Sequence, residues 1–379
     1  MNTDAARREE TVRAQPSPAE RTPWGVGGRP TLGLWLAHEL LLAVGAWVTL
    51  ASGPATALYG LPWFRWDVGL YEQLTHLGYG GSPPSSMAFF PGVPVYLWLT
   101  HWPLAALVLM QVAVLALLVQ VRALASRWGL APPAAFLAQA LVAFTPATVY
   151  YSTAYPETWL AVGLAGMLLA MGSGHPWRAA GWAVLAGTMD PLGLAMGVGA
   201  GAWTAVAVVR RDWVRFRAGI TWGLGSVLAL AIVAGTLWVS IGRPLAFIGE
   251  QQAWHTRWLF PGVQIVQALS GHLSLTAAAL LTMLPVVVLG AVGVLSAARR
   301  SEWHAAVATI GVVLLLIPLS FYSNGLPLAM TALFVSVDLP ITVAAAGLLP
   351  RRLGLAAVAA FAAWAMVDGV LFAHGWFWG

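Results

Sequence analysis

Cysteine and lysine are absent from this chain of 379 residues, and charged residues make up only 9% of it. Without cysteine, the protein can form no disulfide, thiolate metal site, catalytic thiol or palmitoyl anchor. Soluble domains contain about 25% charged residues, so the low charge excludes an ordinary soluble globular protein. The 19 basic residues are all arginine and are scattered between apolar runs, which argues against nucleic acid as a partner.

Hydrophobic residues make up 59% of the chain and form runs long enough to cross a bilayer. We count about eleven membrane segments, at 31–51, 103–121, 132–150, 158–173, 179–189, 191–209, 219–239, 275–296, 304–320, 327–348 and 353–373. Residues 179–209 are expected to form a short helical hairpin, in which Asp190 caps the second helix and Pro191 occupies its first turn. The predicted fold is therefore an all-α, polytopic transmembrane helix bundle. Because no internal repeat or inverted pair of halves is evident, we expect residues 31–379 to form a single domain.

Arginine clusters predict the orientation of these segments. The clusters lie at 122–127, 178, 210–217, 299–300 and 351–352, each next to an apolar run. All of them fall on one side of the membrane if 179–209 is a hairpin. The positive-inside rule makes that side cytoplasmic. We therefore expect a plasma-membrane protein with a disordered cytoplasmic tail at 1–30 and an extracytoplasmic carboxyl terminus. The less hydrophobic stretches at 53–102, 151–157, 240–274 and 322–325 would then lie outside.

The first of these external stretches carries a recognisable pattern. It reads Arg65-Trp66-Asp67, then Tyr71, then Leu77-Gly78-Tyr79, and later Ala88-Phe89-Phe90-Pro91. This order resembles the PIG-V-like membrane mannosyltransferases, which are related to GPI mannosyltransferase 2 and belong to the GT-C class of polytopic glycosyltransferases. Tyr155-Pro156-Glu157 and the segment from Gln251 to Trp258 resemble further motifs of that family, in the same order along the chain.

The resemblance implies a GT-C-like fold with helices in the external loops and a glycosyltransferase activity. The donor would be a polyprenyl-phosphate sugar, expected to be mannose, and the acceptor a lipid, a glycan or a protein on the external side. Neither a Walker loop nor a dinucleotide fingerprint is present, so we expect no nucleotide cofactor.

Asp67 is the candidate general base. It lies among aromatic residues just after the first membrane segment, at the level where aromatic rings line the membrane–water interface. A carboxylate there can accept the proton of an acceptor hydroxyl as the oxygen attacks the anomeric carbon, and partial burial would bring its pKa toward neutrality. The alternative is a structural Asp67 that caps a helix or pairs with Arg65.

Glu157 is the second candidate catalytic residue. It would converge on the same external cavity and bind sugar hydroxyls or assist Asp67. Its position at the start of a membrane segment is equally explained by a favourable charge at a helix amino terminus. Two carboxylates from distant loops do not make a metal motif, so a divalent ion is not indicated.

Arg257 is the best candidate to hold the phosphate of the donor, because a planar guanidinium can bind two phosphate oxygens. Arg65, Arg243 and His255 are further candidates for this role. The alternative for each external arginine is contact with lipid headgroups. We assign substrate binding to Asp190 in the turn of the hairpin, which would face the external side, and to six residues of the external stretches: Trp66, Tyr71, Tyr155, Gln251, Gln252 and Trp254. For Asp190, helix capping is the alternative explanation.

A transporter or lipid flippase is the alternative function. Glu39, Asp338 and Asp368 lie within predicted membrane segments, where ionisable side chains are costly and need a partner or a cavity. They would couple transport to ion or proton movement, or, with His38, simply tie helices together. A third possibility is a non-catalytic membrane subunit, which predicts that Asp67 can be lost without effect.

Overall fold

A computed structural model describes residues 28–52, 61, 63–270, 275–322, 328 and 330–375. Most of the predicted tail, residues 1–27, therefore lies outside the described residues, as do 376–379 and part of the predicted external stretch 322–325. The one part of that tail that is described, residues 28–30, is helical, so the first helix begins three residues before the predicted segment.

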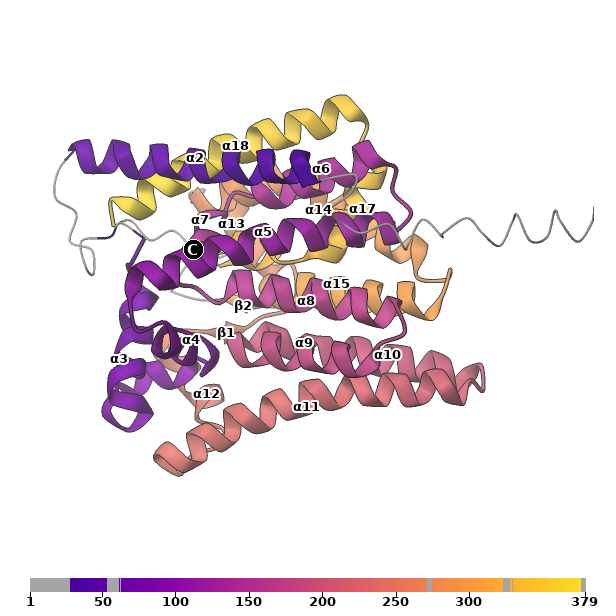
Figure 1. Ribbon diagram of the computed structural model, residues 1–379, viewed down its shortest axis with the longest axis horizontal. Coiled ribbons are helices and arrows are strands. Elements are labelled where there is room, and N and C mark those ends of the chain that lie inside the picture. Colours follow the sequence, from indigo (N-terminus) through magenta and orange to yellow (C-terminus); the bar gives the residue numbers. More distant parts are fainter. Residues whose placement is uncertain are drawn as a thin grey trace, which may run out of the picture.

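Helices account for most of the described residues, and the predicted all-α fold is confirmed. The long helices and those that follow the remaining predicted segments lie side by side in one bundle (Figure 1). They are α2 (Gly28–Ser52), α5 (Pro103–Arg127), α6 (Pro132–Ala143), α8 (Glu157–Gly172), α9 (Pro176–Met189), α10 (Ala195–Val209), α11 (Trp213–Ile241), α14 (Leu275–Ala297), α15 (Glu302–Ser320), α17 (Leu339–Leu348) and α18 (Arg351–Ala373).

Among the described residues, seven helices are long and apolar enough to cross a membrane. They correspond to α2, α5, α10 with the turn before it, α11, α14, α15 and α18. The remaining members of the bundle are shorter: α6 has 12 residues, α8 has 16, α9 has 14 and α17 has 10. The length and composition of these helices thus indicate a membrane-embedded helical protein.

The bundle has two different ends. We call one the arginine end, because the connections and helix termini there carry Arg122, Arg127, Arg178, Arg210, Arg211, Arg215, Arg217, Arg299, Arg300, Arg351 and Arg352. It lies on the right in Figure 1. One contact at this end joins segments far apart in the sequence: the Arg127 guanidinium lies 5.7 Å from the ring centre of Trp303. The predicted gathering of the arginine clusters at one side is therefore present in the fold.

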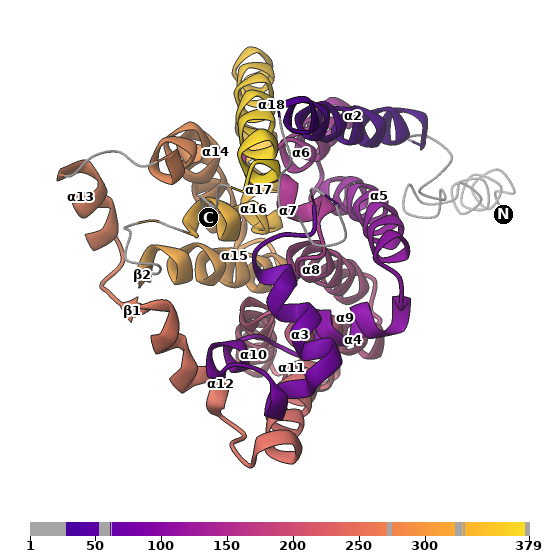
Figure 2. The same ribbon diagram turned by 90° about the vertical axis from the view of Figure 1, so that its left-hand side faces the viewer.

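The other end, which we call the loop end, comprises the described residues within 61–102, 144–156, 190–194, 242–270 and 321–338 and faces the reader in Figure 2. Its elements are short. They are α3 (Asp67–Gly81), η3 (Pro84–Ala88), α4 (Gly92–Thr100), α7 (Val149–Ser152), η4 (Pro191–Leu194), α12 (Ala246–Gly249), η5 (Glu250–Trp254), β1 (Arg257–Trp258), α13 (Val263–Ser270), β2 (Phe321–Tyr322) and α16 (Thr331–Ser336). The predicted helices of the first loop are present, and β1 pairs antiparallel with β2.

Two predicted segments are wrong in extent. The segment expected at 132–150 ends as α6 at Ala143, because Pro146 follows and disfavours helical geometry in the residue before it. The segment expected at 327–348 is divided into α16 and α17. The division falls at Asp338, whose carboxylate accepts a hydrogen bond from the backbone N–H of Ile341 at 3.2 Å and so caps α17.

The hairpin predicted at 179–209 exists as a change of chain direction, but its arms do not pack mainly on each other. Helix α9 packs chiefly against α8 and α11, and α10 packs against α11 and α15. The turn itself is as predicted. Asp190 accepts a hydrogen bond from the N–H of Leu192 at 2.7 Å, and Pro191 begins η4.

Glycine allows some of these helices to approach closely. A Cβ on Gly225 of α11 would lie 2.3 Å from the carbonyl oxygen of Ala180 in α9, and a Cβ on Gly290 of α14 would lie 2.3 Å from that of Ile341 in α17. Atoms cannot share that space, so both crossings require glycine. Small residues at helix contacts are typical of bundles packed within a membrane.

Candidate functional site

The loop end brings together the two motifs that carry the candidate catalytic carboxylates. Asp67 is the first residue of α3, and its backbone N–H donates a hydrogen bond of 3.3 Å to the phenolic oxygen of Tyr155. Tyr155 precedes α8, which begins at Glu157. Residues separated by almost ninety positions thus lie side by side, as expected for parts of one site.

Asp67 follows an unusual backbone conformation. Trp66 has φ 56° and ψ −122°, a combination that residues with a side chain rarely adopt. Such conformations persist where the surrounding structure holds them, and they cluster at functional sites. The indole of Trp66 is 44% exposed, whereas Asp67 is half-buried. Burial raises the pKa of Asp67 from 3.8 to about 7, so its carboxyl group exchanges a proton near neutral pH.

Tyr71 lies one helical turn after Asp67 on the same face of α3 and is buried. The pKa of its phenol is raised well above the ordinary value, first by burial and then by the negative charges of Asp67, Glu157 and Asp190. All three carboxylates therefore lie near one phenol. The sequence predicted that Asp67, Glu157 and Asp190 share one region, and the structure brings them together.

The environments of Glu157 and Asp190 differ. Glu157 is only 5% exposed, and its Oε2 atom has no hydrogen-bond partner among the described residues. Asp190 uses one oxygen to cap η4. Burial raises the pKa of Asp190 to about 6, and the hydrogen bond from Leu192 opposes that shift. An unpartnered buried carboxylate oxygen is costly in a folded protein, which makes Glu157 a group suited to contact a ligand hydroxyl.

Aromatic rings line the same region. The ring of Tyr155 lies 6.4 Å from that of Tyr71 and 5.0 Å from that of Tyr150, in edge-to-face arrangements. Tyr71 also contacts Phe89, with 4.9 Å between ring centres. Burial and the nearby charge of Asp67 raise the pKa of the Tyr155 phenol, so it stays protonated. These phenols act as hydrogen-bonding groups and not as bases.

The segment 251–258 reaches this aromatic group through Trp254. Its indole N–H donates to the carbonyl oxygen of Ser85 at 3.3 Å, and its ring lies 5.5 Å from Phe89. Phe89 in turn contacts Tyr71. A row of three rings therefore leads from Trp254 to the residue beside Asp67, although these segments are far apart in the sequence.

Arg257 lies three residues beyond Trp254 in β1, held by the pairing of Arg257 with Tyr322. Its side chain is exposed, and the described residues offer it no hydrogen bond or ion pair. Gln252 and His255 are exposed and Gln251 is half-buried, with the Gln251 carbonyl accepting a 2.6 Å hydrogen bond from the Thr256 hydroxyl. The charge of Arg257 is thus available to an anion.

The other two candidate arginines are less accessible to a phosphate. Arg243 forms a 3.0 Å ion pair with Glu250, so its charge is already balanced. Arg65 is only 7% exposed, and its Nη1 atom would lie 3.1 Å from a Cβ on Gly375, just beyond the end of α18. Arg65 therefore packs against the end of α18, and Arg257 is the cation best placed to meet a ligand.

Some of the ionisable residues considered for a transporter form hydrogen bonds within the described part of the bundle, and others do not. His38 is buried in α2, with Nδ1 at 2.7 Å from the carbonyl oxygen of Ala143 and Nε2 at 2.8 Å from the Ser152 hydroxyl. Asp338 caps α17. The carboxylate oxygens of Asp368 are buried without a hydrogen-bond partner in the described part of the chain. His38 thus ties α2 to the segments of Ala143 and Ser152, one of the roles anticipated from the sequence, whereas the side-chain hydrogen bond of Asp338 stays within its own helix.

Sequence reasoning did not assign a role to Phe89 or Tyr79. Phe89 links Tyr71 to Trp254, and the Tyr79 hydroxyl donates to the Phe89 carbonyl oxygen at 2.8 Å. Both belong to the motifs that carry the family resemblance, and that membership was the available signal. Within the described residues, no three His, Asp or Glu side chains are grouped so as to hold a metal ion.

Known proteins do not identify the function of this site. No model of a protein family matches the chain, and no curated protein sequence matches it either. The likeness to PIG-V-like mannosyltransferases therefore depends on the motifs around Asp67, Glu157 and Arg257, and the activity that it implies is a proposal.

Proposed function

We propose that the protein is an integral membrane glycosyltransferase of the GT-C type, which transfers a sugar, expected to be mannose, from a polyprenyl-phosphate donor to an external acceptor. The observation that carries the proposal is the meeting of the Asp67 and Glu157 motifs at the loop end, where the Asp67 N–H donates to the Tyr155 phenol at 3.3 Å. The charges of Asp67, Glu157 and Asp190 all act on the nearby phenol of Tyr71. A sugar offers hydroxyl groups that carboxylates can accept hydrogen bonds from and an apolar face that aromatic rings can contact, and this region supplies both kinds of side chain.

In the proposed reaction, Asp67 accepts the proton of the acceptor hydroxyl. The acceptor oxygen forms a bond to the anomeric carbon as the bond from that carbon to the phosphate oxygen breaks, with inversion of configuration. The electron pair of the broken bond stays on the polyprenyl phosphate, and Arg257 stabilises the charge through paired hydrogen bonds. Glu157 and Asp190 hold sugar hydroxyls. A pKa near 7 suits Asp67 to this role, since general bases work best when their pKa lies near the working pH.

We further propose that the chain passes the membrane about eleven times, with the arginine end in the cytoplasm and the loop end outside. The alternating direction of α2, α5, α6, α8 to α11, α14, α15, α17 and α18 supports this topology, and so does the positive-inside rule. Single cysteines at Ser17 and Ser82 of the cysteine-free chain test it. An impermeant thiol reagent applied to intact cells should label the cysteine at 82 and leave that at 17 unmodified, and the reverse pattern would invert the topology.

The activity is tested with purified protein, a membrane lipid extract as the source of acceptor, and radiolabelled polyprenyl-phosphate mannose. We expect label to pass into a product that is absent when Asp67 is replaced by Asn. Nucleotide-activated mannose supplied in place of the lipid donor should give no product. Transfer from the soluble donor alone would contradict the proposal, because the phosphate site described here would then have no role.

A further inference from the structure

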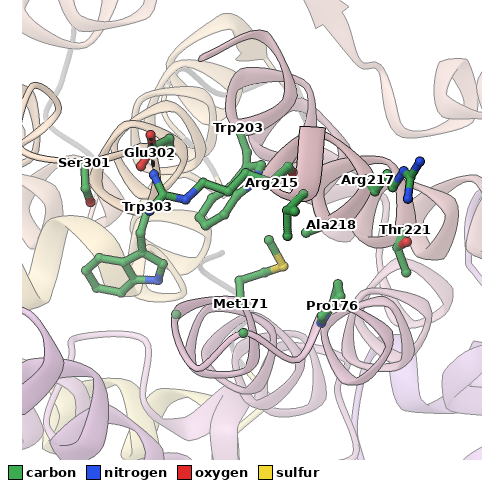
Figure 3. A pocket seen from close by; sticks show the side chains of 13 residues that line it. Met171, Pro176, Trp203, Arg215, Arg217, Ala218, Thr221, Ser301, Glu302 and Trp303 are labelled. Atoms are coloured by element: carbon green, nitrogen blue, oxygen red, sulfur yellow. Dashed lines mark hydrogen bonds and ion pairs between the residues drawn. The ribbon is translucent and has the colours of Figure 1, made fainter. Parts of the chain in front are cut away.

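A cavity of about 590 Å³ lies at the arginine end, far from the candidate site (Figure 3). Helices α8, α9, α10, α11 and α15 all contribute to its wall. Its volume falls within the range of about 300–1,000 Å³ that is usual for small-molecule sites. The apolar part of the wall includes Met171, Trp203, Val214 and Ala218. The cavity can therefore hold a small ligand with an apolar portion.

The charges around this cavity leave one arginine unbalanced. Glu302 accepts hydrogen bonds from the guanidinium groups of Arg210 at 2.5 Å and Arg215 at 2.7 Å. Arg215 also lies 3.3 Å from a carboxylate oxygen of Asp212. These two cations and two anions balance one another. Arg217 also lines the cavity but has no hydrogen bond or ion pair among the described residues, so the wall carries one net positive charge.

Figure 3 shows Arg217 and Thr221 on one side of the cavity, with Arg215 and Glu302 on the other. A ligand anion that meets Arg217 is therefore separated from the carboxylate of Glu302. The guanidinium can bind two phosphate oxygens at once, and the Thr221 hydroxyl adds a hydrogen-bond donor on the same side.

Two exposed tryptophans indicate the depth of this cavity in the membrane. Trp177 is 71% exposed and follows Pro176, and Trp213 is 64% exposed and precedes Val214. Pro176 and Val214 both line the cavity. Exposed tryptophans of membrane proteins concentrate at the level of the lipid headgroups. The cavity thus lies where the phosphate of a membrane lipid is found.

We propose that this cavity binds the phosphodiester headgroup of an anionic membrane lipid from the leaflet at the arginine end. The single negative charge of the phosphodiester matches the single unbalanced charge of Arg217, and the apolar wall receives the glycerol and the first carbons of the acyl chains. This lipid is neither donor nor acceptor of the proposed transfer, because the cavity and the Asp67 region lie at opposite ends of the bundle (Figure 1).

Native mass spectrometry of the purified full-length protein in detergent tests the proposal. We expect phosphatidylglycerol to bind more tightly than phosphatidylcholine. Arg217→Gln should weaken phosphatidylglycerol binding about fivefold, the effect of about 1 kcal/mol per arginine near a membrane surface. The matched control is Arg352→Gln, which removes an exposed arginine at the same end that does not line the cavity, and it should change binding less than twofold.

A second variant tests the cavity itself. Ala218→Leu fills part of the space without changing the charge, and it should weaken phosphatidylglycerol binding while the protein still elutes as a single folded species. Equal binding of the two lipids, wild-type binding by both cavity variants, or equal losses from the Arg217 and Arg352 variants would overturn the proposal. Displacement of the lipid by an equal concentration of inorganic phosphate would mean that the cavity recognises free phosphate and not a lipid.

Discussion

Replacement of Asp67 by Asn is expected to change activity and stability in opposite directions. The amide has nearly the same shape as the carboxyl group but cannot accept the proton of an acceptor hydroxyl. General-base assistance is worth about 10² to 10⁴-fold, so transfer should fall by at least about a hundredfold. At the same time, the variant no longer places a negative charge in a half-buried site, and its folded state should gain stability at alkaline pH.

The size of the stability gain follows from the pKa of Asp67. Burial raises this pKa from 3.8 to about 7, so the folded protein binds the proton more tightly than the unfolded chain between these values. Stability contributed by the protonated carboxyl is present below pH 3.8 and is lost as pH rises to about 7. A shift of about three units corresponds to at most about 4 kcal/mol. Since water reaches the half-buried side chain, we expect at least about 1 kcal/mol.

Thermal unfolding in detergent, followed from pH 5 to pH 8.5, measures this difference. Asp67→Asn should melt higher than the wild type at pH 8.5, and the gap should narrow at pH 5. In parallel, the wild-type transfer rate should fall about tenfold for each pH unit below 7, because the base becomes protonated.

Asp212→Asn is the matched control, because Asp212 also lies at the amino terminus of a helix, where it caps α11 by accepting a 3.0 Å hydrogen bond from the Arg215 N–H at the arginine end. It should leave transfer unchanged and should not raise the melting temperature. An Asp67→Asn protein that transfers sugar within threefold of the wild-type rate, or that melts lower at pH 8.5, would refute the assignment of Asp67 as a general base whose charge destabilises the folded state.

Three further substitutions test other parts of the account. Arg257→Lys keeps the charge but loses the paired hydrogen bonds, so transfer from the lipid donor should fall markedly, whereas Arg300→Lys at the arginine end should be almost silent. Tyr155→Phe removes the phenolic oxygen that holds the start of α3, and a several-fold lower turnover is expected from the loss of about 1 kcal/mol. Gly290→Val should lower stability by about 1–3 kcal/mol in a thermal melt, because a Cβ there overlaps α17. Gly201→Val, with open space around it, should cost less, and equal losses would contradict the packing argument.

Much of this fold can be predicted from the sequence because a membrane protein must place long apolar helices across the bilayer. Apolar runs and arginine clusters mark where helices lie and turn, and Asp190 caps its turn as the Asp-Pro pair predicts. The exceptions have local causes. Helix α6 ends before Pro146, and Asp338 starts a new helix inside a run that hydropathy alone reads as continuous. Hydropathy measures the free-energy cost of exposing side chains to water, so it contains no information on the backbone constraints set by a proline or a helix cap.

The candidate site is predicted less completely. The motifs name Asp67, Glu157 and Tyr155 but give no distances, since the contact between Asp67 and Tyr155 depends on how the first residue of α3 meets the residues that precede α8. The row of rings from Trp254 through Phe89 to Tyr71 joins segments about 180 residues apart and has no signature in a single sequence. The cavity at the arginine end is likewise invisible there, because its wall comes from separate helices whose packing decides whether space remains.

The most direct test of the central claim is the transfer of radiolabel from polyprenyl-phosphate mannose by the wild-type protein and by the Asp67→Asn and Asp212→Asn variants, compared in one experiment at pH 8. We expect a labelled product with the wild type and with Asp212→Asn, and a product reduced at least about a hundredfold with Asp67→Asn. Equal transfer by all three proteins, or none by the wild type, would contradict that claim.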